Sequence, residues 1–141
     1  MSPAPADPPA RASTAGPVLV IGTGLLGTSL ALALTAAGVE VQLSDTSPTS
    51  LALARDMGAG AIRAGGDAQP GLVVVATPPD VAADVVLRSL AEHPGAVVTD
   101  VASVKDRVAA EVRGRGGAAA RRYVGRSEEH TSELQSPSWI S

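Results

Sequence analysis

An apolar run that ends in closely spaced glycines is the feature that most constrains the fold of this chain. Residues 18–21 are four apolar, mostly β-branched side chains, a pattern typical of a buried strand. They lead directly into Gly-Thr-Gly-Leu-Leu-Gly at residues 22–27. In a strand–turn–helix unit, the first glycine of this motif allows a tight turn, the second lets the backbone approach a pyrophosphate, and the third lets the helix pack closely on the strand. The spacing predicts a dinucleotide site that includes Gly22, Gly24, Leu25, Leu26 and Gly27.

The residues that follow the glycines support this interpretation. Gly38 stands where a helix would end, and residues 39–43 alternate like a strand before Asp45. A carboxylate at this position can accept both hydroxyls of an adenosine ribose, and its charge repels a 2′-phosphate. Asp45 therefore favours NAD over NADP, since residues 46–48 offer no arginine, although Asp45 with Ser47 could instead cap the next helix. Between the glycines and Gly38, apolar residues recur at helical spacing: Leu26, Leu30, Ala33, Leu34 and Ala37.

Strand and helix patterns alternate along the rest of the body. We expect strands over 61–63, 71–76, 96–101 and 122–124, and helices over 48–57, about 80–92 and 104–113. In the helix over 48–57, Leu51, Leu53 and Ala54 are available to face the sheet. This alternation predicts an α/β fold, a Rossmann-type doubly wound parallel sheet over residues 17–125. The ligand crevice of such a sheet lies outside the carboxyl ends of its strands, where Asp45, Thr77, Pro78 and Ser103 would converge.

Composition excludes several other classes of protein. The 141 residues contain no cysteine, so we expect one domain with no disulfide framework and no thiolate metal site. The net charge is −3 and the basic residues are scattered, which argues against a nucleic-acid partner. No apolar run approaches the ~20 residues of a membrane helix. These features predict a cytoplasmic protein that binds no metal, membrane or nucleic acid.

The two ends differ in composition from the body. Residues 1–16 are rich in proline and alanine without an apolar block, which predicts a disordered leader. Residues 126–141 contain no alanine, glycine or valine but five serines and three glutamates. Within this tail, residues 126–136 resemble the in-frame translation of a widely used sequencing adapter. We therefore interpret residues 126–141 as a non-native polar tail left by sequence assembly.

The stretch from Asp100 to Lys105 carries a second group of candidate residues. Ser103 followed by Asp106 matches a capping box, and a cap at the carboxyl end of a strand can also present its hydroxyl to a ligand. Lys105 is either a solvated helix residue or a cation near an acidic substrate. Asp100 could be a charge at the start of a helix. We expect His93, beside Pro94, to interact with carbonyls at a helix end rather than to act in catalysis.

Four segments together resemble the nucleotide-binding half of bacterial prephenate dehydrogenases. They are residues 20–31, Val-Ala-Thr-Pro-Pro at 75–79, Thr-Asp-Val-Ala-Ser-Val-Lys at 99–105, and Tyr-Val-Gly at 123–125. In that family, NAD accepts a hydride from prephenate, and decarboxylation gives 4-hydroxyphenylpyruvate on the route to tyrosine. The resemblance implies that Ser103 hydrogen-bonds the catalytic histidine or the substrate hydroxyl. It also implies that the nicotinamide is bordered by Ala76, Thr77 and Pro78.

The chain departs from this family after Gly125. The family continues with Ser-His-Pro-Met-Ala-Gly, whose histidine polarises the substrate hydroxyl, whereas residues 126–128 here are Arg-Ser-Glu. We therefore expect an inactive fragment that lacks both this histidine and the helical domain through which the full-length protein would form a homodimer. Three alternatives remain: an arogenate dehydrogenase, a related reductase of imines or β-hydroxy acids, and a non-catalytic NAD-sensing module. The pattern at residues 100–105 argues against the reductases.

Overall fold

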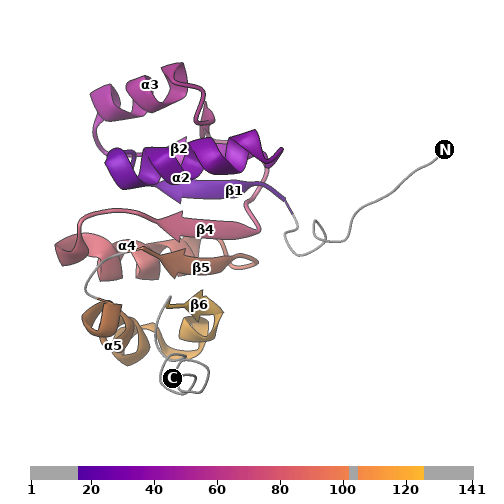
Figure 1. Ribbon diagram of the computed structural model, residues 1–141. Helices are drawn as coiled ribbons and strands as arrows, with labels where there is room; N and C mark the ends of the chain where they lie inside the picture. Colours follow the sequence, from indigo (N-terminus) through magenta and orange to yellow (C-terminus); the bar gives the residue numbers. More distant parts are fainter. Residues whose placement is uncertain (1–15, 102–104, 126–141) are drawn as a thin grey trace, which may run out of the picture.

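The computed structural model describes residues 16–101 and 105–125, which form a parallel sheet with helices on both faces (Figure 1). The strand order is β3-β2-β1-β4-β5-β6. This order grows outward from β1 on one side and from β4 on the other, which is the doubly wound arrangement. The predicted α/β class and Rossmann-type sheet are confirmed. The strands are β1 (Val18–Ile21), β2 (Val41–Ser44), β3 (Ala61–Ile62), β4 (Leu72–Val75), β5 (Val97–Asp100) and β6 (Tyr123–Val124).

Small aliphatic side chains build the core on both faces of the sheet. Because side chains alternate along a strand, Val18 and Val20 of β1 contribute to one cluster, while Leu19 and Ile21 belong to the other. The first cluster includes Ala31 and Ala54 from the helices that cover it, and the second is covered by the later helices. The described helices are α2 (Leu25–Ala36), α3 (Pro48–Asp56), α4 (Pro79–Glu92), α5 (Lys105–Gly116) and the 3₁₀ helix η1 (Gly117–Arg122).

Helix α2 approaches the sheet through its smallest residues. Its buried positions are Gly27, Thr28 and Ala31, whereas Leu26 is 57% exposed. The helix that the apolar spacing predicted is present, but Leu26, Ala33 and Ala37 are exposed. The reason is Gly27, which brings the helix so close to β1 that only small side chains fit between them. Leu30 and Leu34 pack at the margin of the core, and the helix ends before Gly38 (φ +90°), as predicted.

Helix α3 follows the predicted pattern only in part. Ala54 is buried and Leu51 packs against the core, but Leu53 is 60% exposed. The N-cap is Ser47, whose Oγ accepts a hydrogen bond from the Ser50 N–H at 3.2 Å. Pro48 follows at the first helical position, where its missing N–H costs nothing.

The connection from β3 to β4 contains no helix and leaves polar groups against the sheet. Its residues 63–71 return from the carboxyl end of β3 to the amino end of β4. The buried Gln42 side chain donates through Nε2 to the carbonyl of Ala68 at 2.9 Å. Arg63 donates through Nη1 to Gln42 Oε1 at 2.6 Å and to the same carbonyl at 2.8 Å. The sheet surface beside β2 is therefore polar on the face that α4 partly covers.

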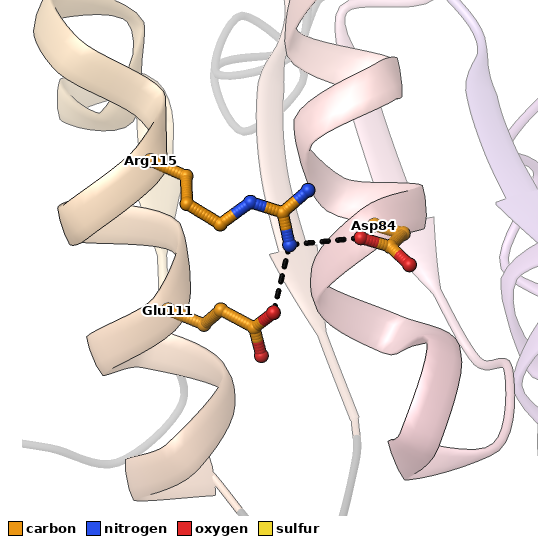
Figure 2. A network of polar contacts seen from close by, with 3 residues as sticks. All are labelled: Asp84, Glu111 and Arg115. Carbon is orange, nitrogen blue, oxygen red and sulfur yellow. Dashed lines mark hydrogen bonds and ion pairs between the residues drawn. The ribbon is translucent and has the colours of Figure 1, made fainter.

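An exposed ion-pair network joins α4 to α5. Arg115 Nη1 lies 2.9 Å from Asp84 Oδ1 and 2.7 Å from Glu111 Oε2 (Figure 2). Such surface pairs contribute little to stability individually, because water screens them. The firmer attachment of α5 is the burial of Val108, Ala109 and Val112.

Arg122 and His93 stabilise the amino-terminal edge of the sheet. The Arg122 guanidinium donates to the carbonyls of Leu90 at 2.6 Å, His93 at 2.9 Å and Ala96 at 2.9 Å. It therefore satisfies carbonyls at the end of α4, the role expected of His93. The His93 ring instead donates through Nδ1 to Gln69 Oε1 at 2.8 Å, so that expectation was wrong.

Asp100 is a core residue. It is fully buried at the end of β5, where its carboxylate accepts a hydrogen bond from the Tyr123 hydroxyl of β6. Its placement differs from the expected charge at the start of a helix, because β5 continues through Asp100, which pairs with Val75 of β4. In the two described ranges, every helix is too short or too polar to cross a lipid bilayer.

Candidate functional site

A groove of about 730 Å³ lies at the carboxyl edge of β1, β2 and β4. This edge is the switch point of the sheet, where chain connections leave in opposite directions and ligands commonly bind. Ser103, the predicted catalytic residue, lies outside the described residues, as do residues 1–15 and 126–141. Eight of the nine predicted cofactor residues line the groove: Gly22, Gly24, Leu25, Leu26, Asp45, Ala76, Thr77 and Pro78.

The three glycines of the loop have different surroundings. Gly22 has a φ of +102°, and a Cβ there would lie 2.7 Å from the carbonyl oxygen of Ala76. A Cβ on Gly27 would lie 1.8 Å from the carbonyl oxygen of Gly22, so Gly27 sits beneath the loop and permits the close approach of α2. A Cβ on Gly24 would meet no atom within 4 Å, and this residue is exposed to the groove. Of the three, Gly24 alone leaves open space next to the backbone.

The amino terminus of α2 faces this open space, and no acidic side chain in the first turn of the helix compensates its partial positive charge. Gly24 is the N-cap, no side chain caps the helix, and its first turn contains no acidic residue. The first N–H groups of a helix have no partner within it, and the helix dipole gives that end a partial positive charge. The geometry suits an anion such as a phosphate.

Asp45 lines the groove beside the glycine loop, where hydrogen bonds from Thr23 and Ser47 hold its carboxylate. Its Oδ2 accepts from the N–H of Thr23 at 2.6 Å and from the Thr23 hydroxyl at 2.7 Å. Its Oδ1 accepts from the Ser47 N–H at 2.9 Å. Burial raises the pKa of Asp45, but hydrogen bonds from Ser47, Thr23 and Thr46 outweigh it, so the pKa lies below its ordinary value of 3.8. The carboxylate is therefore ionised at neutral pH and retains acceptor capacity on Oδ1.

Thr23 is a site residue that the sequence reasoning missed. It is 5% exposed, and its carbonyl accepts a hydrogen bond from the Thr28 hydroxyl at 2.9 Å. Through Asp45 it ties the glycine loop to the end of β2. In the glycine motif, any residue can occupy the position of Thr23. The one signal that could have indicated Thr23 is its hydroxyl, which can donate to the aspartate that follows the next strand.

The end of β4 supplies the third wall. The Ala76 N–H donates to the Ile21 carbonyl at 2.7 Å, which fixes the turn from β4 towards Thr77 and Pro78. Thr77 Oγ1 is buried and has no hydrogen-bond partner within the described part of the chain. Buried hydroxyls are nearly always satisfied in folded proteins, so this atom is a candidate ligand contact.

Helix α4 contributes a row of residues that the sequence reasoning also missed. Val81, Val85 and Arg88 line the groove at the spacing of one helix face. Arg88 and Val85 also line a second compartment of about 350 Å³, which shares Ile21 and Ser44 with the groove. The two spaces therefore adjoin along the sheet surface between α4 and residues 63–71.

The second compartment contains charged and polar groups. Arg63, Gln69, Glu92 and His93 line it. The pKa of His93 lies below 6.5, because burial disfavours the charged ring and the Arg63 charge adds to this effect, while Glu92 opposes it. His93 is therefore neutral at neutral pH.

Comparison with known proteins agrees with this geometry. The family model described as prephenate dehydrogenase, nucleotide-binding domain, matches residues 30–125. NovF of Streptomyces niveus, named as a probable prephenate dehydrogenase, is 40% identical over 87 residues, which cover 62% of this chain and 24% of NovF. The chain thus matches about a quarter of the length of this relative.

Solved structures show the same fold. A Corynebacterium glutamicum protein, provisionally named a prephenate dehydrogenase, superposes with a TM-score of 0.62 at 32% identity, covering 79% of this chain and 36% of that one. Synechocystis arogenate dehydrogenase superposes with a TM-score of 0.59 at 24% identity, covering 77% and 38%, and so supports the fold alone. Because the family model covers more than half of its residues, the chain belongs to the prephenate dehydrogenase family through the nucleotide-binding domain.

Proposed function

We propose that the chain binds NAD in the groove at the carboxyl edge, as the cofactor domain of a prephenate dehydrogenase. The observation that carries the proposal is the uncapped end of α2, which opens over Gly24 in the groove that the ionised Asp45 also lines. The first-turn N–H groups of α2 would bind the pyrophosphate, and Gly24 leaves room for it. When bound, NAD supplies the acceptor for a hydride.

The preference for NAD over NADP is proposed from the charge of Asp45. Hydrogen bonds from Thr23 and Ser47 hold this carboxylate ionised and fixed beside the glycine loop. An ionised carboxylate there accepts hydroxyls of the adenosine ribose and repels a 2′-phosphate. The buried Thr77 hydroxyl, next to Ala76 and Pro78, is a candidate partner for the other half of the cofactor.

Prephenate is the proposed substrate of the whole protein. The family match and the likeness to NovF support it. In this reaction the hydride on the ring carbon that bears the 4-hydroxyl would pass to bound NAD while a base takes the hydroxyl proton. Loss of CO₂ then makes the ring aromatic, and the oxygen regains a proton in the product, 4-hydroxyphenylpyruvate. The family resemblance supports a role for Ser103 near the reacting hydroxyl. We propose that the whole protein acts as a cytoplasmic homodimer.

We expect the 141-residue chain to bind cofactor without turning over prephenate. No histidine lines the groove in the described ranges, and His93 lies in the adjoining compartment with its ring bonded to Gln69. Removing the proton from the substrate hydroxyl needs a base within hydrogen-bond reach, worth ~10²–10⁴-fold in rate. NADH formation should therefore stay at background, and rates near those of a full-length homologue would contradict this expectation.

The cofactor proposal is tested by calorimetric titration of the chain with NAD and NADP. NAD should bind more tightly, and Asp45→Ala should weaken NAD binding by about 1–2 kcal/mol, on the scale of a charge-assisted hydrogen bond. Asp56→Ala is the matched control, because Asp56 is an exposed carboxylate on α3 paired only with its neighbour Arg55 among the described residues. Tighter binding of NADP to the unmutated chain would contradict the preference.

A further inference from the structure

Arg88 occupies a distinctive place at the adenosine side of the groove. Along α4, Val81, Val85 and Arg88 form one wall, so two aliphatic side chains are followed by a guanidinium. Thr46 and Ser50 line the groove as well, and they flank Asp45 and the start of α3. The groove is therefore lined both by apolar side chains and a planar guanidinium from α4 and by small polar side chains near the start of α3.

The Arg88 guanidinium makes no hydrogen bond or ion pair to any described residue, unlike other arginines of the fold. Arg115 is paired with two carboxylates (Figure 2), and Arg122 is bonded to three carbonyls. Arg63 is bonded to Gln42. Arg88 is also exposed, so its planar head is available to a ligand that enters the groove.

The position of Arg88 at a boundary adds a second argument. It lines both the groove and the second compartment, so its side chain lies where the two spaces meet. Of the residues that line both spaces, Arg88 alone carries a charge.

We propose that Arg88 binds the adenine base of the dinucleotide by stacking its guanidinium on the purine ring. This inference rests on the proposed function, which puts the ribose at Asp45 and so directs the base towards α4. The planar guanidinium stacks on π systems, and Val81 and Val85 offer the apolar surface that a base requires. A role as a ligand of a 2′-phosphate is disfavoured because the Asp45 carboxylate lines the same groove.

The test compares the affinities of the unmutated chain, Arg88→Met and Arg88→Lys for NAD, NADP, ADP-ribose and nicotinamide mononucleotide. Arg88→Met should weaken NAD and ADP-ribose to a similar extent, about fivefold, which is the size of a cation–π contact. Arg88→Lys should weaken them similarly, since it keeps the charge but loses the plane. Nicotinamide mononucleotide, which lacks adenine, should bind equally to all three. Arg121→Met, an exposed arginine of η1, is the matched control.

The outcomes separate this inference from the proposed function. If NAD binds all variants equally well, the role of Arg88 is overturned while the cofactor proposal stands. A loss confined to NADP, restored by Arg88→Lys, would identify a phosphate ligand and also overturn stacking. If the unmutated chain binds none of the adenine nucleotides, both proposals are overturned.

Discussion

The amino and carboxyl edges of the sheet differ in how far their polar groups are hydrogen-bonded among the described residues. At the amino edge, Arg122 satisfies three carbonyls and the His93 ring is bonded to Gln69. At the carboxyl edge, the end of α2 is uncapped, the Thr77 hydroxyl has no partner among the described residues, and Leu25 is 89% exposed. The amino edge therefore contributes to stability through satisfied polar groups, while the carboxyl edge, in the described part of the chain, has groups that are exposed or without a partner.

Substitution beneath the glycine loop should have the largest effect. Gly27→Ala would place a Cβ 1.8 Å from the Gly22 carbonyl oxygen, so α2 or the loop must move. Overpacking of backbone against backbone should cost about 3 kcal/mol of unfolding free energy. Urea denaturation measures this loss.

Gly24→Ala is the matched control, because a Cβ there meets no atom within 4 Å. It should change stability by no more than ~0.5 kcal/mol but weaken NAD binding, since the new methyl group enters the ligand space. Equal stabilities of the two variants would contradict the different roles assigned to these glycines.

Loss of the Arg122 guanidinium should have the next largest effect, confined to stability. Arg122→Met leaves the carbonyls of Leu90, His93 and Ala96 without their shared donor, which should cost about 2 kcal/mol. Arg121→Met, at the neighbouring exposed position, should stay within ~0.5 kcal/mol. NAD affinity should be unchanged in both variants. A loss of NAD affinity in Arg122→Met would contradict the assignment of stability to the amino edge and of ligand binding to the carboxyl edge.

Acid should weaken the amino edge by a smaller amount through His93. Its pKa is lowered in the folded chain, so the unfolded chain binds the proton more readily and stability decreases as the pH falls below 6.5 towards the folded pKa. Urea midpoints at about pH 7.5 and about pH 5.5, on either side of the ordinary histidine pKa, measure the change. His93→Gln should reduce this dependence, so an unchanged slope in His93→Gln would contradict the assignment.

Local patterns in the sequence predicted the parts of the fold that depend on neighbours along the chain. The apolar runs predicted the strands, and the glycine spacing predicted the turn over Gly22 and the close contact at Gly27. Asp45, Thr77 and Pro78 were expected to converge because parallel strands end at one edge, and they line one groove.

Tertiary contacts explain what the sequence could not predict. Leucine periodicity predicted helix α2 but not which of its residues meet the sheet, because helix–sheet distance rather than hydrophobicity selects the small residues there. The absence of an arginine after Asp45 was used to favour NAD, yet packing of α4 brings Arg88 into the same groove. Similarly, no local signal pairs Arg122 with the carbonyl of His93, 29 positions earlier, or with that of Leu90, 32 positions earlier.

The central claim is that the carboxyl edge holds the dinucleotide, and mapping of NAD binding by backbone amide NMR tests it most directly. The largest shifts are predicted at Gly22, Gly24, Asp45 and Ala76. The amides of Gln69, His93 and Arg122 at the amino edge should stay nearly unchanged. Shifts centred on the amino edge, or no shifts at millimolar NAD, would contradict the claim.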